Sequence, residues 1–193
     1  ATDYVLVKNG RDPDAQHAPK NIIVDAGSSR FDSSLWWFLC AYDQNSIVMN
    51  DIYGFEYSLL EPVNFWDHVP EKWFSSFHFY NTPIAPGLSK TNPLQLIQRV
   101  ATPSDFVVLK LDVDTAEVEI PIAQQLMRTP ELVNLVDEFF FELHFRCEYM
   151  LRCGWSSPKP PPDQIAGLKL NRPSAWMFFS KLRQLGIRAH AWV

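Results

Sequence analysis

The sequence predicts an α/β protein whose central sheet is mostly parallel and carries helices on both faces. Short runs of β-branched and aromatic residues recur without polar alternation, which is typical of strands buried on both sides of a sheet. Segments with apolar residues at helical spacing separate these runs, so successive strands are expected to be joined by crossovers and to lie parallel. With 193 residues, 47% of them hydrophobic, the chain is long enough to bury one full core.

The first half of the chain is expected to contain a lead-in segment, three strands and two helices. Residues 1–20 are polar and form the lead-in, and residues 21–193 form a single domain. Apolar and aromatic runs predict strands at residues 21–25, 51–56 and 77–80. Apolar residues at three- and four-residue spacing predict helices at residues 35–42 and 94–100. Residues 57–76, an insert rich in aromatic side chains, are a candidate wall of an acceptor site.

The second half continues the alternation of strands and helices. The strongest expected strand covers residues 106–112. Further elements are expected as a helix at 117–126, a strand at 139–144, a helix at 174–185 that stops at Gly186, and a final strand at 187–193. The proline-rich residues 154–163 are expected to form a loop within this domain.

The composition disfavours several classes of protein. Lys and Arg number 17 against 22 Asp and Glu, and the resulting net charge of −5 disfavours a dedicated nucleic-acid binder. No run of about 18 apolar residues predicts a membrane-spanning helix. Cys40, Cys147 and Cys153 are odd in number and irregularly spaced, which argues against a disulfide framework or a zinc site. The lack of a targeting signal favours a cytoplasmic protein, and the lack of an initiator Met favours a domain excised from a longer protein with flanking domains.

Acidic or ionisable residues close four of the expected strands. They are Asp25, Glu56, Asp112, and Glu142 with His144. Strands commonly end in polar turn residues, but ligands bind at the carboxyl ends of parallel strands, and four such endings together favour a functional site. Because Glu142 and His144 are two residues apart, their side chains are expected to point to the same side.

The first two strand ends favour nucleoside binding. After the first strand, an acid followed by Gly27 forms a tight turn whose backbone can approach a ligand closely. With only one glycine, this turn is not a P-loop. Glu56 at the end of the second strand can accept hydrogen bonds from ribose hydroxyls.

Four segments together resemble the FkbM-type S-adenosylmethionine (SAM)-dependent methyltransferases. The segment Asp25-Ala26-Gly27-Ser28-Ser29 resembles the family's first motif, D-V-G-A-N-x-G. Residues 52–56 resemble V-Y-A-F-E, residues 109–117 resemble L-K-I-D-V-E-G-A-E, and residues 141–144 resemble the E-x-H ending of the fifth strand. The order and rough spacing agree from about residue 21 to the end of the chain.

This resemblance implies a Rossmann-like class I methyltransferase fold with SAM lying across the first strands. Residues 25–29 would then pass under the methionine part of SAM, and Glu56 would hold the ribose. Asn81 would lie near the adenine, and Asp112 would lie beside the sulfonium and the acceptor. The acceptor that the resemblance implies is a saccharide or a glycosylated small molecule.

Methyl transfer to a hydroxyl requires an aligned nucleophile and removal of its proton. Asp112, Glu142 and His144 are the candidate catalytic residues, because carboxylates and imidazoles accept protons. A bound cation would serve the same purpose, with Asp112, Asp114 and Glu142 as candidate ligands. Such oxygen donors favour Mg²⁺ or Mn²⁺ over zinc. The leading expectation is therefore a SAM-dependent O-methyltransferase that acts on a sugar.

Two alternatives remain open at the level of sequence. Asp112-Val113-Asp114 is a D-x-D motif after an apolar strand, as in metal-dependent glycosyltransferases that bind a nucleotide sugar. That alternative leaves Gly27 and Glu56 unexplained. The chain could also be a catalytically inactive SAM-fold binding module, because Ser29 and Phe31 replace the Asn and last Gly of the family's first motif.

Overall fold

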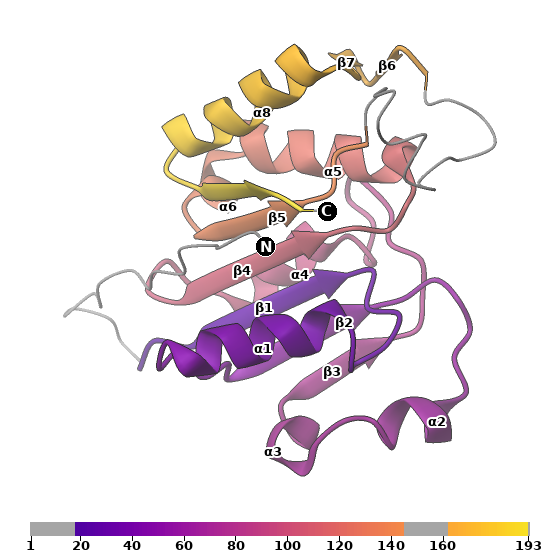
Figure 1. Cartoon of the computed structure of the whole chain (residues 1–193). Coiled ribbons are helices and arrows are strands. Elements are labelled where there is room, and N and C mark those ends of the chain that lie inside the picture. Colours follow the sequence, from indigo (N-terminus) through magenta and orange to yellow (C-terminus); the bar gives the residue numbers. More distant parts are fainter. Residues whose placement is uncertain (1–17, 145–161, 193) are drawn as a thin grey trace.

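A six-stranded parallel sheet forms the centre of the protein (Figure 1). The computed structural model describes residues 18–144 and 162–192. The strands of this sheet are β1 (Asn21–Ala26), β2 (Asp51–Phe55), β3 (Phe77–Tyr80), β4 (Phe106–Leu111), β5 (Glu138–Phe141) and β8 (Arg188–Ala191). They are arranged in the order β3-β2-β1-β4-β5-β8, and each neighbouring pair is parallel. This is the strand order of a doubly wound Rossmann sheet.

Helices cover both faces of the sheet. One face packs against α1 (Ser34–Gln44), α2 (Pro62–Trp66) and α3 (Glu71–Phe74), and the other against α4 (Pro93–Val100), α5 (Ala116–Arg128), α6 (Pro130–Val133) and α8 (Arg172–Gln184). Successive strand residues alternate between the two cores, so Ile23 joins the α1 side whereas Ile22 and Val24 join the α5 side. Burial on both faces explains why the strands lack polar alternation.

The sequence-based expectation of a mostly parallel sheet between two helical layers is confirmed. All six expected strands and all four expected helices are present, with ends displaced by a few residues. The strand expected at 139–144 ends at Phe141, so Glu142 and His144 lie in the segment that follows it. A short antiparallel hairpin, β6 (Gln164–Ile165) with β7 (Leu168–Lys169), and the short helices α2, α3 and α6 were not anticipated.

Some sequence-based expectations lie outside the described residues. These are most of the lead-in segment, Cys147, Cys153 and most of the proline-rich loop. Within the described ranges, none of the helices combines the length and apolar character that crossing a membrane requires.

A buried polar network ties α1 to β5 and β8. Glu138 is fully buried, and its Oε2 accepts a hydrogen bond from the Tyr42 hydroxyl at 2.7 Å. Its Oε1 lies 2.8 Å from Nε2 of His190. Burial, together with the adjacent Glu138 carboxylate, raises the pKa of Tyr42, so this phenol remains a donor.

Candidate functional site

The loops after β1, β2 and β4 pack tightly against one another at the carboxyl edge of the sheet. Gly27 has a φ of +102°, and a Cβ at this position would collide with the carbonyl oxygen of Asp112. The N–H groups of Gly27 and Ser28 both donate to the carbonyl of Phe55, at 3.0 and 2.9 Å. Glycine is therefore required here by the chain's own packing, whether or not a ligand binds.

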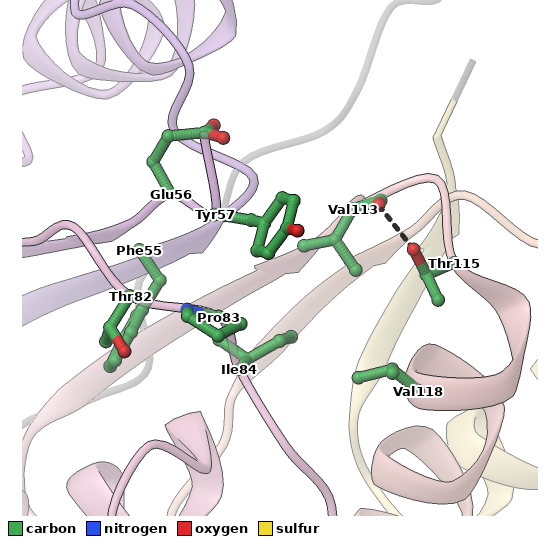
Figure 2. Close-up of a pocket in the computed structure, with 9 residues that line it drawn as sticks. All are labelled: Phe55, Glu56, Tyr57, Thr82, Pro83, Ile84, Val113, Thr115 and Val118. Carbon is green, nitrogen blue, oxygen red and sulfur yellow. Dashed lines mark hydrogen bonds between the residues drawn. The ribbon is translucent and has the colours of Figure 1, made fainter. Parts of the chain in front are cut away.

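A cavity of about 310 Å³ opens beside this junction, between the ends of β2, β3 and β4 (Figure 2). Its walls come from the end of β2, the segment after β3, and the loop between β4 and α5. The lining residues are Phe55, Glu56, Tyr57, Thr82, Pro83, Ile84, Val113, Thr115 and Val118. The volume is at the small end of the range of about 300–1,000 Å³ that is typical of small-molecule sites. Most of the wall is apolar, with a few polar groups at its edge.

Glu56 is the only carboxylate among the residues that line this cavity, and its loop is held in place from behind. The side chain is largely buried, and its Oε1 accepts a hydrogen bond from the N–H of Ser58 at 2.6 Å. Within the described ranges, Oε2 has no hydrogen-bond partner. Asn81 donates to the carbonyls of Glu56 and Ser58 at 2.9 and 2.7 Å, and accepts from the N–H of Leu60 at 3.0 Å. Asn81 thus shapes the Glu56 loop and is not among the residues that line the cavity.

A buried lysine lies beneath the junction between β1 and β4. Lys110 is 1% exposed, and its Nζ lies 3.1 Å from Oδ1 of Asp25 and 3.0 Å from Oδ2 of Asp112. Burial lowers the pKa of Lys110, but the charges of the two carboxylates outweigh it and hold this pKa above its ordinary value. Lys110 therefore stays charged at neutral pH and fixes the carboxylate of Asp112 at the end of β4.

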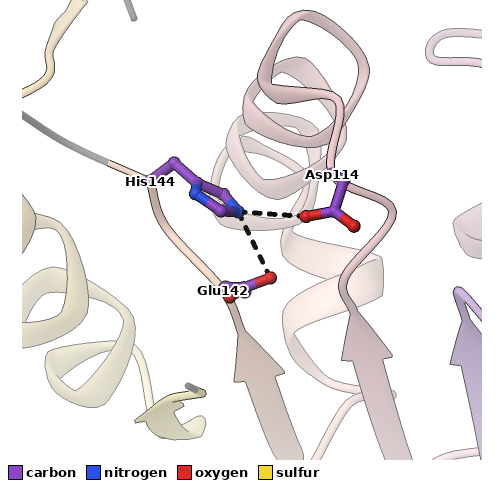
Figure 3. A group of neighbouring side chains, drawn as sticks. All are labelled: Asp114, Glu142 and His144. Carbon is purple, nitrogen blue, oxygen red and sulfur yellow. Dashed lines mark ion pairs between the residues drawn. The ribbon is translucent and has the colours of Figure 1, made fainter. Parts of the chain in front are cut away.

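Three ionisable side chains meet above the ends of β4 and β5 (Figure 3). Nε2 of His144 lies 3.2 Å from Oε2 of Glu142 and 3.5 Å from Oδ1 of Asp114. One donor atom from each residue falls within 4.8 Å of the other two, which is close enough to share a cation. Glu142 is buried, His144 is half-buried and Asp114 is exposed, so the group runs from the interior to the surface.

The charges of this cluster are coupled to Asp112. Burial raises the pKa of Glu142, and its ion pair with His144 opposes this rise only in part. The ion pair with Glu142 in turn raises the pKa of His144 against the effect of burial. Burial also acts to raise the pKa of Asp112, but hydrogen bonds to Glu142 and the charge of Lys110 bring it below its ordinary value. The pKa of Asp112 therefore lies below its ordinary value, and the pKa of the neighbouring Glu142 lies above it.

The structure brings some of the sequence-predicted site residues together and buries others away from the site. Asp112, Glu142 and His144 meet at one place, and Glu56 lines the neighbouring cavity. In the first-strand turn, only Gly27 and Ser29 are accessible, whereas the side chains of Asp25, Ala26 and Ser28 are fully buried. Of the three expected cation ligands, Asp114 and Glu142 cluster with His144, while Asp112 faces Lys110.

Sequence reasoning missed part of the cavity wall and two buried charged residues. The segment around Asn81 was expected near the adenine, but Pro83 and Ile84 were not singled out, although their place shortly after the third strand was the signal that could have found them. Lys110 interrupts an otherwise apolar strand, which marks it for a buried partner. Glu119 is 1% exposed in the first turn of α5, and burial raises its pKa to about 7.

Comparison with known proteins leaves the family open. No model of a protein family matches this chain. A search of curated proteins also finds no significant relative. The resemblance to FkbM-type methyltransferases therefore stays a prediction based on four short segments and their order.

Proposed function

We propose that this chain binds SAM in the cavity beside Glu56 and directs its methyl group to a hydroxyl of a saccharide. The observation that carries the proposal is the adjacency of two sites at one edge of the sheet. The cavity lies between the ends of β2, β3 and β4, and the Asp112–Glu142–His144 cluster lies at the ends of β4 and β5. Ligands of doubly wound sheets bind where the strand order reverses, which here is between β1 and β4.

The residues around the cavity suit a nucleoside. Oε2 of Glu56 has no partner in the described ranges and is available to a ribose hydroxyl. Phe55, Ile84 and Val118 offer an apolar wall against which a flat base can pack. The ring of Tyr57, which is 76% exposed, stands between Glu56 and Val113 in Figure 2 and can contact the base from the open side.

The cluster suits removal of a hydroxyl proton. SAM, when bound, supplies an activated methyl group for in-line displacement. The neutral imidazole of His144 would accept the proton of the acceptor hydroxyl, and the ionised carboxylate of Glu142, 3.2 Å from Nε2, would stabilise the imidazolium that forms. Asp112, held ionised by Lys110, would orient the acceptor by accepting a hydrogen bond from a neighbouring hydroxyl. The saccharide acceptor itself rests on the family resemblance.

A divalent cation is the alternative means of activating the hydroxyl. Asp114, Glu142 and His144 offer two carboxylate oxygens and one imidazole nitrogen, a donor set that suits Mn²⁺ or Mg²⁺. Exhaustive treatment with EDTA separates the two possibilities. Activity that survives EDTA assigns the proton to His144, and activity lost in EDTA and restored by Mn²⁺ or Mg²⁺ assigns the step to the cation.

Calorimetric titration with S-adenosylhomocysteine tests the proposal. We expect micromolar binding by the wild type and a loss of about 10- to 100-fold in Glu56→Gln, because a hydrogen bond to a charged group is removed. Glu61→Gln, a change at an exposed residue of the same loop, should bind like the wild type. Transfer of a labelled methyl group to glycans then separates an enzyme from a binding module. An absence of binding with and without Mg²⁺ would refute the proposal, and binding of a UDP- or GDP-sugar with Mn²⁺ would favour the glycosyltransferase alternative.

A further inference from the structure

The loop Val113–Thr115 belongs to both candidate sites at once. Val113 and Thr115 line the cavity, whereas Asp114, between them, faces His144 (Figures 2 and 3). Asp114 has a φ of +54°, in the left-handed region that few residues other than Gly, Asn and Asp adopt. The conformation of this loop therefore decides the shape of the cavity wall and the place of the Asp114 carboxylate together.

Glu119 holds this loop from beneath with both of its carboxylate oxygens. Oε1 accepts a hydrogen bond from the N–H of Val113 at 2.8 Å, and Oε2 accepts one from the N–H of Thr115 at 3.2 Å. The two donors lie on either side of the left-handed Asp114, and such concave turns of backbone N–H groups bind anions. The anion here is the chain's own side chain.

The need to cap the amino end of α5 does not by itself explain why the carboxylate of Glu119 is buried. Thr115 is the N-cap residue, but its side chain makes no capping bond, and its Oγ1 donates to the carbonyl of Val113 at 3.2 Å. An exposed Ser or Asp at the N-cap would satisfy the helix end without burying a charge. Glu119 is instead 1% exposed, and it reaches past the helix to a residue of the loop.

We propose that Glu119 is a positioning residue that fixes the Val113–Thr115 loop in the form that both closes the cofactor cavity and presents Asp114 to His144. The part that concerns the cofactor rests on the function proposed above, whereas the part that concerns the loop does not. Loss of the carboxylate leaves two partly buried backbone N–H groups without their acceptors, and the loop is then no longer held in this form.

Amide hydrogen exchange tests the loop without reference to function. In the wild type, the amides of Val113 and Thr115 should exchange slowly, even though Thr115 is exposed. In Glu119→Gln, at least one of the two amides should exchange about tenfold faster or more, because the NH2 group that replaces one carboxylate oxygen cannot accept a hydrogen bond. Glu117→Gln is the matched control, since Glu117 lies in the same helical turn but is exposed. Fast exchange of both amides in the wild type would overturn the proposal even if the Glu119 variant fails to fold.

Titration with S-adenosylhomocysteine tests the cofactor part. We expect Glu119→Gln to bind about tenfold more weakly than the wild type, and Glu117→Gln to bind normally. If the protein is catalytically active, Glu119→Gln should show a higher KM for SAM than the wild type. Faster loop exchange with unchanged affinity would refute the link between Glu119 and the cofactor. An absence of binding by the wild type refutes the proposed function instead, while the exchange data still decide the role of Glu119 in the loop.

Discussion

Replacing Lys110 by Met is the sharpest test of how the candidate site is built. Met keeps most of the volume of the lysine stem but removes its charge, and leaves Asp25 fully buried without its only described partner. Asp112 loses its cation as well. Breaking a buried ion pair by removing one partner costs about 3–5 kcal/mol. For a domain of 150–250 residues, this corresponds to a fall in Tm of about 6–20 °C.

Thermal and urea unfolding measure this loss. Lys72→Met is the control, because Lys72 pairs with Asp43 at 2.8 Å on the surface, where a pair contributes about 0–1 kcal/mol. The double variant Asp25→Asn/Lys110→Met should recover part of the loss, since it no longer buries an unpaired charge. Because the pKa of Asp112 is lowered in the folded state, its ionised carboxylate stabilises the fold above about pH 3.8, and this stabilisation is lost as the pH falls through the folded-state pKa. The loss of stability in Lys110→Met should therefore become smaller in acid. A Lys110→Met variant within about 1 kcal/mol of the wild type would refute this reasoning.

The remaining predictions concern the loops and the acid cluster. Gly27→Ala should lower the free energy of unfolding in urea by about 2–6 kcal/mol, because the strain of a left-handed Ala adds to a collision with the Asp112 carbonyl. Gly167 also has a positive φ, but a Cβ there would meet open space, so Gly167→Ala should lower it by only about 1 kcal/mol. In metal-free protein, NMR titration should find the pKa of His144 above 6.5 and lower in Glu142→Gln, since the ion pair with Glu142 raises it. The stabilisation that this ion pair gives is present below about pH 6.5 and is lost as the pH rises through the folded pKa of His144. A His144 that titrates at or below 6.5 would contradict the pairing.

The layers of the fold could be predicted because buried strands and helices have recognisable patterns of apolar residues in the sequence. Strands such as 106–111 are covered on both faces, so they appear as uninterrupted apolar runs, and α1 shows its buried stripe at Leu35, Phe38, Leu39 and Tyr42. The short elements α2, α3, α6 and the β6–β7 hairpin have too few residues for a periodicity to stand out.

The candidate site was only partly predictable, because residue type alone does not say which way a side chain faces. Asp25 and Asp112 each stand at or next to the end of an apolar strand in the sequence. In the structure, Asp25 is sealed under Lys110, while Asp112 reaches the edge beside Glu142. Successive residues of a strand face opposite sides of the sheet, and this alternation, together with the packing of the adjacent strand, determines that Asp25 is buried and Asp112 is accessible.

The sequence by itself determined the parallel sheet, its two helical layers and the gathering of acidic residues at one edge, because hydrophobic periodicity and strand direction are local properties. Tertiary structure alone decided the partners: Lys110 between two carboxylates, Glu119 beneath the Val113–Thr115 loop, and His144 between Glu142 and Asp114. Each of these contacts joins residues from different elements or fixes a loop by burial. Their energies depend on distances and solvent exclusion, which arise only when the strands stand side by side.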